Sequence, residues 1–452
     1  MKKIFFLIAC LTFINTIVFA NSITNSTLYN TDSLEITAPH AVLIDMDSGK
    51  MLYEKDGYTA TYPASTTKIL TAILVLENCS LDEKVTASYE AVNSVYANGT
   101  TASIQEGETH TVKDLLSTML IHSANDAAYI LAEHVGGSIQ SFASMMNARA
   151  KELGALCTNF VNPNGLPNSS HKCSAYDMTL FANYAMNNFP EFREIVKTVN
   201  YSLPITPEYE KLYFSEYPNA QKATRYLTTT TNHLINPART AYYYEYATGI
   251  KTGYTDAAAN CIVASAKKDD VELIVVIFGA SGWGNLRDDT VKLFEYGFSK
   301  LKSETLASAG NIIDKIKIKN AETNNDLLNV VVKDNLKATV SNTDLVEAFS
   351  PSIVINSDLK APIESGDIIG SITYNIYNKT YTSNLLAGNS IVEKVSVTAV
   401  ATNIFSTIIK IILWAVGIIV ALFISLVFLR AFIITQNQKK SRRRRMYNAR
   451  FR

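Results

Sequence analysis

The stretch PASTTKILTAIL, residues 63–74, places Ser65 three positions before Lys68 at the start of an apolar run. The apolar residues recur at helical spacing to about Asn78, so we expect a helix that begins near Ser65. Residues three apart lie on one side of a helix, which brings Lys68 to the Ser65 hydroxyl. A lysine desolvated beside other cations can be neutral and can take the proton of that hydroxyl. The stretch therefore predicts an activated serine nucleophile at a helix N-terminus.

Two further motifs follow in the chain. Residues 123–125 read SAN between two helical patterns, where Ser123 could pass a proton and Asn125 could hold a peptide group. Taken singly, this motif is more typical of a helix cap. Residues 251–253 read KTG on a predicted strand, where a cation and a hydroxyl could hold a carboxylate and Gly253 lets a substrate lie close. The three motifs in this order favour one acyl-transfer site.

Apolar patterning around the motifs predicts an α/β domain. Residues 41–53 form a strand hairpin, and strands are expected from Ile250, over 262–266 and over 273–278. An amphipathic helix is expected over residues 287–302. Because strands lie at both ends and helical patterns between them, we expect one sheet formed by the first and last strands, with a helical insert. The other expected helices cover residues 111–121, 126–135, 139–153 and 175–187.

After about Ser303 the pattern changes to short β-rich runs separated by Gly, Asn and Asp turns, which predicts a separate all-β domain. Its expected strands are residues 312–318, 328–332, 352–355, 368–374 and 392–400. The predicted organisation of the chain is a signal peptide (1–20), a linker (21–35), a catalytic domain (36–302), the β domain (303–396), a transmembrane helix (411–429) and a basic cytoplasmic tail (430–452).

Charge lies unevenly along the chain. The 452 residues carry 41 basic and 41 acidic side chains, but nine basic and no acidic residues follow Leu429. Without those nine and the two N-terminal lysines, 30 basic side chains remain against 41 acidic ones. An acidic body argues against a nucleic-acid-binding protein.

Both ends of the chain resemble targeting segments. Lys2 and Lys3 precede an apolar run that ends at Val18-Phe19-Ala20, as in a secretory signal peptide, although an uncleaved anchor would share this pattern. The uncharged run 411–429 is about 28 Å long as a helix, close to the hydrocarbon thickness of a bilayer. The basic cluster after it places the tail in the cytoplasm, so the body is expected outside the cell membrane.

The sequence does not decide whether the cysteines form a disulfide or remain free thiols. Cys10 lies in the signal segment, and a Cys157–Cys173 bridge and four free thiols (Cys79, Cys157, Cys173 and Cys261) are equally compatible with the sequence. No Cys/His spacing indicates a metal site, and no cofactor is expected because serine, lysine and backbone donors suffice for acyl transfer.

The three motifs and their surroundings resemble the D-alanyl-D-alanine carboxypeptidases, which are low-molecular-mass penicillin-binding proteins. The resemblance extends through residues 41–55, 123–128, 160–167 and 249–255, and residues 359–370 resemble that family's C-terminal β domain. It implies the β-lactamase-like, penicillin-recognising fold, an acyl-enzyme on the terminal D-Ala–D-Ala bond of peptidoglycan stem peptides, and covalent binding of β-lactams.

The resemblance also implies residue roles. Ser65 would be the nucleophile, Lys68 the base and Ser123 the proton relay. The substrate would be bound by Asn125, Lys251, Thr252, Gly253, Tyr254 and, near the carboxylate, Arg287. Backbone N–H groups of Ser65 and Tyr254 would form the oxyanion hole. His171 and Asp177 match a loop beside the site and receive no chemical role.

The sequence departs from the family pattern in three places. Asn164 stands where the family often has histidine, and the Tyr-rich stretch 201–246 is longer than the family pattern leads us to expect. A full span with a basic tail replaces the amphipathic helix of many relatives. A β-lactamase would need a deacylating Glu after the second motif, and no Glu lies between Leu153 and Phe189. A DD-endopeptidase, a β-lactam-binding membrane sensor and an inactive wall-binding protein are three further functions that the same motifs could serve.

Overall fold

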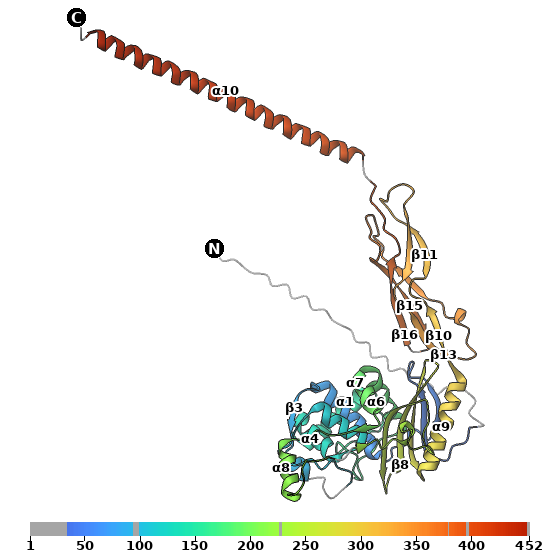
Figure 1. Cartoon of the computed structure of the whole chain (residues 1–452). Helices are drawn as coiled ribbons and strands as arrows, with labels where there is room; N and C mark the ends of the chain where they lie inside the picture. Colours follow the sequence, from blue (N-terminus) through green and yellow to red (C-terminus); the bar gives the residue numbers. More distant parts are fainter. Residues whose placement is uncertain (1–33, 94–98, 226–227, 378, 395–396, 450–452) are drawn as a thin grey trace, which may run out of the picture. The chain divides into compact units, whose positions relative to one another are not determined.

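The computed structural model describes residues 34–93, 99–225, 228–377, 379–394 and 397–449 (Figure 1). The expected signal peptide and most of the linker fall outside these residues. The chain divides into two compact units. The first comprises Met1–Leu306, Lys337–Ser350 and Asn375–Tyr381, and the second comprises Ala307–Leu336, Pro351–Tyr374 and Thr382–Arg452.

The first unit is built on one antiparallel sheet, as the sequence predicted. Its order is β2-β1-β9-β8-β7, so the N-terminal hairpin joins the last strands of the domain and β7 lies at an edge. The strands are β1 (His40–Asp45), β2 (Met51–Lys55), β7 (Ala247–Thr255), β8 (Ala259–Lys268) and β9 (Val271–Ala280).

The sheet is buried on both faces, which explains its uninterrupted apolar runs. In β1, Val42 and Ile44 join the core shared with the helical insert, whereas Ala41 and Leu43 join the core beneath α9 (Trp283–Lys300). This division follows from the two-residue period of a strand. Helix α9 begins four residues before the predicted start.

The insert is helical, as expected, with two short antiparallel pairs. Its helices are η1 (Ala64–Thr67), α1 (Lys68–Asn78), α2 (Tyr89–Asn93), α3 (Val112–Ser117), η2 (Thr118–His122), α4 (Asn125–Gly136), α5 (Ile139–Glu152), α6 (Ala175–Asn188), α7 (Pro190–Val196), α8 (Pro207–Glu216) and η3 (His233–Ile235). The pairs are β3 (Lys84–Thr86) with β4 (Thr109–Thr111) and β5 (Asn200–Tyr201) with β6 (Thr228–Thr229).

The C-terminal region is β-rich, as predicted. One sheet has the order β11-β12-β16-β15-β14, and β10 pairs with β13. The elements are β10 (Leu301–Ala307), β11 (Ile312–Lys317), β12 (Leu327–Val332), β13 (Leu336–Ser341), η4 (Val346–Ala348), β14 (Ser352–Ile355), β15 (Ile368–Ile376) and β16 (Lys379–Ala387).

Two sequence expectations here were wrong or incomplete. The strand expected over residues 392–400 is not formed as a whole, because helix α10 already begins at Val397. Valine and threonine favour strands mainly where they can pair with a neighbouring strand. A helix that has already started gains one hydrogen bond for each residue added, so it can extend through residues with strand propensity. Strands β10, β13 and β16 were missed because polar residues interrupt their apolar pattern.

Helix α10 (Val397–Ala449) contains the predicted span. Its segment Ala401–Met446 has a mean hydropathy of 3.0 in its most apolar window, and none of that window is buried against protein. Among the described residues it is the one helix long and apolar enough to cross a membrane.

The four described cysteines are free thiols, so the Cys157–Cys173 bridge that the sequence left open is not formed. Cys173 and Cys261 are buried, and Cys79 and Cys157 are partly exposed.

Candidate active site

Ser65 lies in the tight turn η1 that leads into α1. The Thr66 hydroxyl donates to the carbonyl oxygen of Pro63 at 2.6 Å, and the Thr67 hydroxyl donates to that of Ala64 at 2.8 Å. Ala64 takes a left-handed backbone conformation with φ 48°. These contacts fix the turn, so Ser65 is presented at the helix start as the sequence predicted.

Lys68 is the first residue of α1 and is fully buried. Its Nζ lies 3.0 Å from Ser65 Oγ, 2.7 Å from Asn125 Oδ1 and 2.9 Å from the carbonyl oxygen of Asn164. The last two oxygens can only accept hydrogen bonds, whereas the serine hydroxyl can also donate. A neutral amine satisfies all three partners, because it gives two N–H groups to the carbonyls and turns its lone pair to the Ser65 proton.

Electrostatics favours this neutral form. Burial lowers the pKa of Lys68 well below its usual value, the charge of Lys251 lowers it further, and Asp126 acts in the opposite direction. Two buried ammonium groups close together are costly, so one of them gives up its proton. Lys68 is therefore suited to act as a base.

The second motif lies where two helical segments meet. Ser123 ends the π-turn η2 with φ 68° and is 7% exposed. Ala124 is the N-cap of α4, and among the described residues no side chain caps that helix, so the motif does not form the helix cap that its sequence taken singly would favour. Asn125 instead directs its amide oxygen to Lys68.

The third motif lies on the edge strand β7. Lys251 is 1% exposed, and burial lowers its pKa to about 7. Its Nζ donates to the carbonyl oxygen of Thr252 at 2.9 Å, and the Thr252 hydroxyl donates to Thr231 Oγ1 at 2.7 Å. The charge of Lys251 acts on Lys68, which places the first and third motifs in one site.

Gly253 is where β7 passes the nucleophile. A Cβ atom added there would lie 2.9 Å from the backbone nitrogen of Ser65 and 3.0 Å from the Ala64 Cβ, too close for any side chain. The next residue, Tyr254, is 61% exposed. The bare backbone at Gly253 thus brings the strand against the Ser65 amide.

Arg287 is the residue least connected to this group. It lies near the start of α9, and among the described residues its guanidinium donates to the neighbouring Asp288 at 3.0 Å. Its Nε is buried without a hydrogen-bond partner in the described part of the chain.

The structure adds residues to which sequence reasoning gave no role. His171 Nδ1 accepts from the Val161 N–H at 3.2 Å, so its Nε2 carries the proton and donates to Thr67 Oγ1 at 2.9 Å. Burial lowers the His171 pKa to about 4, which keeps this tautomer neutral. His171 therefore supports the turn behind Ser65. The accompanying Asp177 accepts from the Leu156 and Cys157 N–H groups and fixes that loop.

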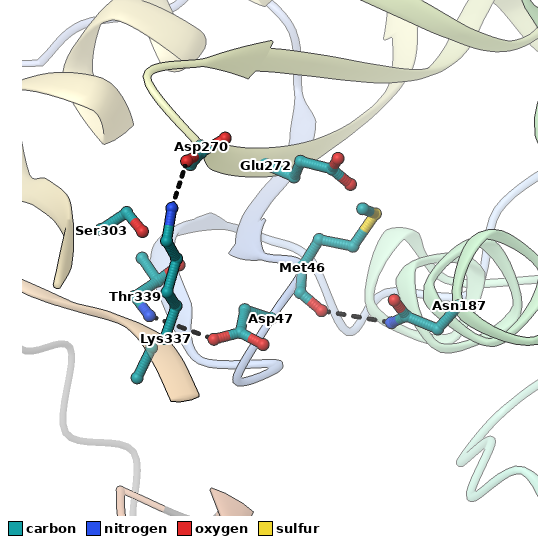
Figure 2. Close-up of a pocket in the computed structure, with 9 residues that line it drawn as sticks. Met46, Asp47, Asn187, Asp270, Glu272, Ser303, Lys337 and Thr339 are labelled. Atoms are coloured by element: carbon teal, nitrogen blue, oxygen red, sulfur yellow. Dashed lines mark hydrogen bonds and ion pairs between the residues drawn. The ribbon is translucent and has the colours of Figure 1, made fainter. Parts of the chain in front are cut away.

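A polar pocket lies elsewhere in the first unit, and none of the motif residues lines it. Figure 2 shows Lys337 bonded to Asp270 and the Thr339 N–H bonded to Asp47. The two bonds are 2.9 Å and 3.1 Å long, and the cavity has a volume of about 200 Å³. Asp47 also accepts from Lys379 and from the Tyr381 hydroxyl. The charges in this pocket are paired, in contrast to those around Ser65.

Two family models match the chain. The D-alanyl-D-alanine carboxypeptidase model (peptidase S11) matches residues 26–282, more than half of the chain and all of the Ser-x-x-Lys, SAN and KTG motifs. The model of the penicillin-binding protein 5 C-terminal domain matches residues 301–395.

Individual relatives and solved structures are also similar to the chain. The chain is 30% identical over 347 residues to the D-alanyl-D-alanine carboxypeptidase DacF of Bacillus subtilis, covering 76% of this chain and 82% of that protein. The solved structure of the D-alanyl-D-alanine carboxypeptidase DacD from Francisella tularensis matches with a TM-score of 0.55 and 27% identity, over 81% of this chain and 96% of that one. The peptidoglycan synthesis regulatory factor PBP3 of Streptococcus pneumoniae matches in fold with a TM-score of 0.62 at 23% identity, over 79% of this chain and all of that one.

Proposed function

The chain belongs to the D-alanyl-D-alanine carboxypeptidase family, and from that membership we propose how its own residues perform the reaction. The protein is a serine-type carboxypeptidase that removes the terminal D-alanine of peptidoglycan stem pentapeptides through an acyl-enzyme, and β-lactams acylate the same serine. The assignment of roles to residues rests above all on Lys68 Nζ, which lies between Ser65 Oγ and two carbonyl oxygens.

Acylation begins at the Ser65 hydroxyl. Its oxygen attacks the carbonyl carbon of the penultimate D-alanine while the proton moves to neutral Lys68, 3.0 Å away. The C–N bond then breaks, and the leaving D-alanine amine takes a proton through the Ser123 hydroxyl. Water hydrolyses the resulting ester and restores Ser65. Asn125 keeps Lys68 in place and presents its amide to the substrate.

Strand β7 supplies the binding surface. As an edge strand it can pair with an extended peptide through main-chain hydrogen bonds. Lys251 and Thr252 hold the terminal carboxylate, and the backbone N–H groups of Ser65 and Tyr254 stabilise the oxyanion. The close passage of Gly253 past Ser65 supports this arrangement. Arg287 remains a candidate for a second contact to the carboxylate.

The test uses the full chain in detergent with a synthetic pentapeptide ending in D-Ala-D-Ala and, in parallel, a fluorescent penicillin. We expect release of free D-alanine together with lasting label, and loss of both in Ser65→Ala. Label that survives in Ser65→Ala would assign the nucleophile elsewhere. Label without release, combined with cleavage of a cross-linked peptide dimer, would indicate a DD-endopeptidase instead.

We infer the location of the protein from its two ends. The N-terminal segment directs export, α10 anchors the chain in the cell membrane, and the basic residues that follow the apolar run keep the tail in the cytoplasm. Because shortened stem peptides cannot act as donors, the activity limits cross-linking and influences cell shape. A reporter fused after Arg452 should be protected from protease added outside cells, and digestion of that reporter would overturn the topology.

A further inference from the structure

A group of potential metal ligands lies away from the catalytic serine, in the helical insert. The Sγ of Cys79, a carboxylate oxygen of Glu83 and a ring nitrogen of His134 all lie within 4.8 Å of one another. Among the described residues this is the one group of three or more His, Cys, Asp and Glu side chains with such spacing. None of the three has a part in the reaction described above.

The three side chains come from the ends of separate elements. Cys79 is the C-cap of α1, Glu83 follows in the turn before β3, and His134 lies in the last turn of α4. His134 Nε2 lies 2.8 Å from Glu83 Oε1, and these side chains are 29% and 41% exposed. The Cys79 N–H bonds to the Val75 carbonyl, so the thiol is held at the helix end. The site is therefore partly preformed and open to solvent on one side.

The local electrostatics favours a cation. The C-termini of α1 and α4 both meet here, and helix C-termini carry partial negative charge. The Glu83 carboxylate adds a full negative charge. Sulfur, imidazole nitrogen and one carboxylate oxygen form a donor set that suits Zn²⁺, which binds them at about 2.0–2.3 Å in tetrahedral geometry.

We propose that Cys79, Glu83 and His134 bind one Zn²⁺-type divalent cation, with water in the fourth position. Binding displaces the Cys79 thiol proton to solvent, replaces the hydrogen bond between His134 and Glu83, and leaves the imidazole proton on Nδ1. To reach tetrahedral spacing, the longer donor separations, up to 4.8 Å, shrink by about an ångström, and the His134–Glu83 pair opens from 2.8 Å.

The cation would have a structural role. Helix α1 begins with Lys68 and α4 begins with Asn125, whose side chains are bonded at 2.7 Å. The metal would join the opposite ends of the same two helices. Since α1 has 11 residues, the metal lies about 16 Å along the helix from Lys68, too far to take part in acyl transfer.

Co²⁺ is the probe, because a cobalt–thiolate bond gives a near-ultraviolet charge-transfer band. We expect the untagged, reduced full chain in detergent to bind one equivalent of Co²⁺ with this band, and to release it on addition of Zn²⁺. Cys79→Ser should lose the band, and His134→Gln and Glu83→Gln should weaken binding at least tenfold, as roughly expected for loss of a ligand or its support. The matched control is Cys157→Ser, which removes the other partly exposed thiol and should keep the band.

A second measurement separates binding from folding. Saturating Zn²⁺ should raise the melting temperature of the wild type by about 5 °C and leave that of Cys79→Ser unchanged. Penicillin labelling should be equal in all variants, which shows that they are folded and that the metal takes no part in the chemistry. Absence of the band in the wild type, its survival in Cys79→Ser, or an equal Zn²⁺ shift in both proteins would overturn the proposal.

Discussion

The first unit contains two groups of lysines that differ in their surroundings. At the active site, Lys68 and Lys251 are almost completely buried and form no ion pair within the described part of the chain. In the pocket of Figure 2, the side chain of Lys337 is 54% exposed and pairs with Asp270. Lys379, which is 42% exposed, pairs with the pocket residue Asp47.

The contrast shows that burial and ion pairing determine whether a lysine stabilises structure or exchanges protons. Lys337 and Lys379 each pair with a carboxylate and contribute to local structure. Burial without a carboxylate partner destabilises the ammonium form, which lowers the pKa of Lys68 well below its usual value and that of Lys251 to about 7. Variants of these lysines and of their neighbours test this contrast.

Replacing Lys68 with methionine should have the largest effect. Lys68→Met keeps most of the buried volume but removes the base, so the rate of acylation by penicillin should fall by about a thousandfold. Lys68→Arg should not restore it, because a guanidinium stays protonated. The matched control is Lys337→Met, which should acylate at the wild-type rate. Near-normal acylation in Lys68→Met would show that Lys68 is not the base and that its burial has no catalytic purpose.

Gly253→Ala tests whether β7 must pass close to Ser65. The added Cβ would meet the Ser65 nitrogen at 2.9 Å and displace a donor of the oxyanion hole. We expect kcat/KM for the pentapeptide to fall about a hundredfold. Gly284→Ala, in α9, is the control, since a Cβ there meets nothing within 4 Å. Equal activity of the two variants would contradict the proposed oxyanion hole.

The pH profile of kcat/KM reports the buried lysines directly. Lys68 acts only when neutral, so activity should rise with pH through its lowered pKa. Lys251 binds the substrate carboxylate only when charged, so activity should fall about tenfold per pH unit above its pKa of about 7. Lys337→Gln should show the same bell-shaped curve. A profile that stays flat on the alkaline side would mean that Lys251 is not the carboxylate ligand.

Asp47→Asn should have the smallest effect. It removes the ion pair with Lys379 and weakens the bonds from the Tyr381 hydroxyl and the Thr339 N–H. Because the Asp47 side chain is 28% exposed, we expect a loss of about 1–2 kcal/mol, or a melting temperature lower by roughly 2–6 °C. D-alanine release should be unchanged; reduced turnover at a temperature where the variant is folded would link this pocket to catalysis.

The parts of the site that the sequence revealed are those encoded locally. Ser65 and Lys68 lie one helical turn apart, so their spacing, together with the apolar helix pattern that follows, predicts their contact. The strand position of Lys251 and Gly253 followed from the apolar residues around them.

The supports of the site could not be predicted in this way. The carbonyl of Asn164 that binds Lys68 is 96 residues away, and it is a backbone group that carries no side-chain signal. His171 reaches Thr67 across 104 residues. His134 is likewise 51 residues from Glu83, so no local motif marks the proposed metal site. Such contacts depend on how the insert folds back on itself, which periodicity does not describe.

The position of β7 at the edge of the described sheet has a consequence for which wall polymers the enzyme can process. A peptide bound as an added strand is recognised through its main chain, and its successive side chains point to opposite faces of the sheet. Selectivity is then concentrated at the terminal carboxylate and the last two residues. We therefore expect the enzyme to tolerate chemical variation in the residue before the D-alanine pair, so that a cell could change the composition of its stem peptides without losing this activity.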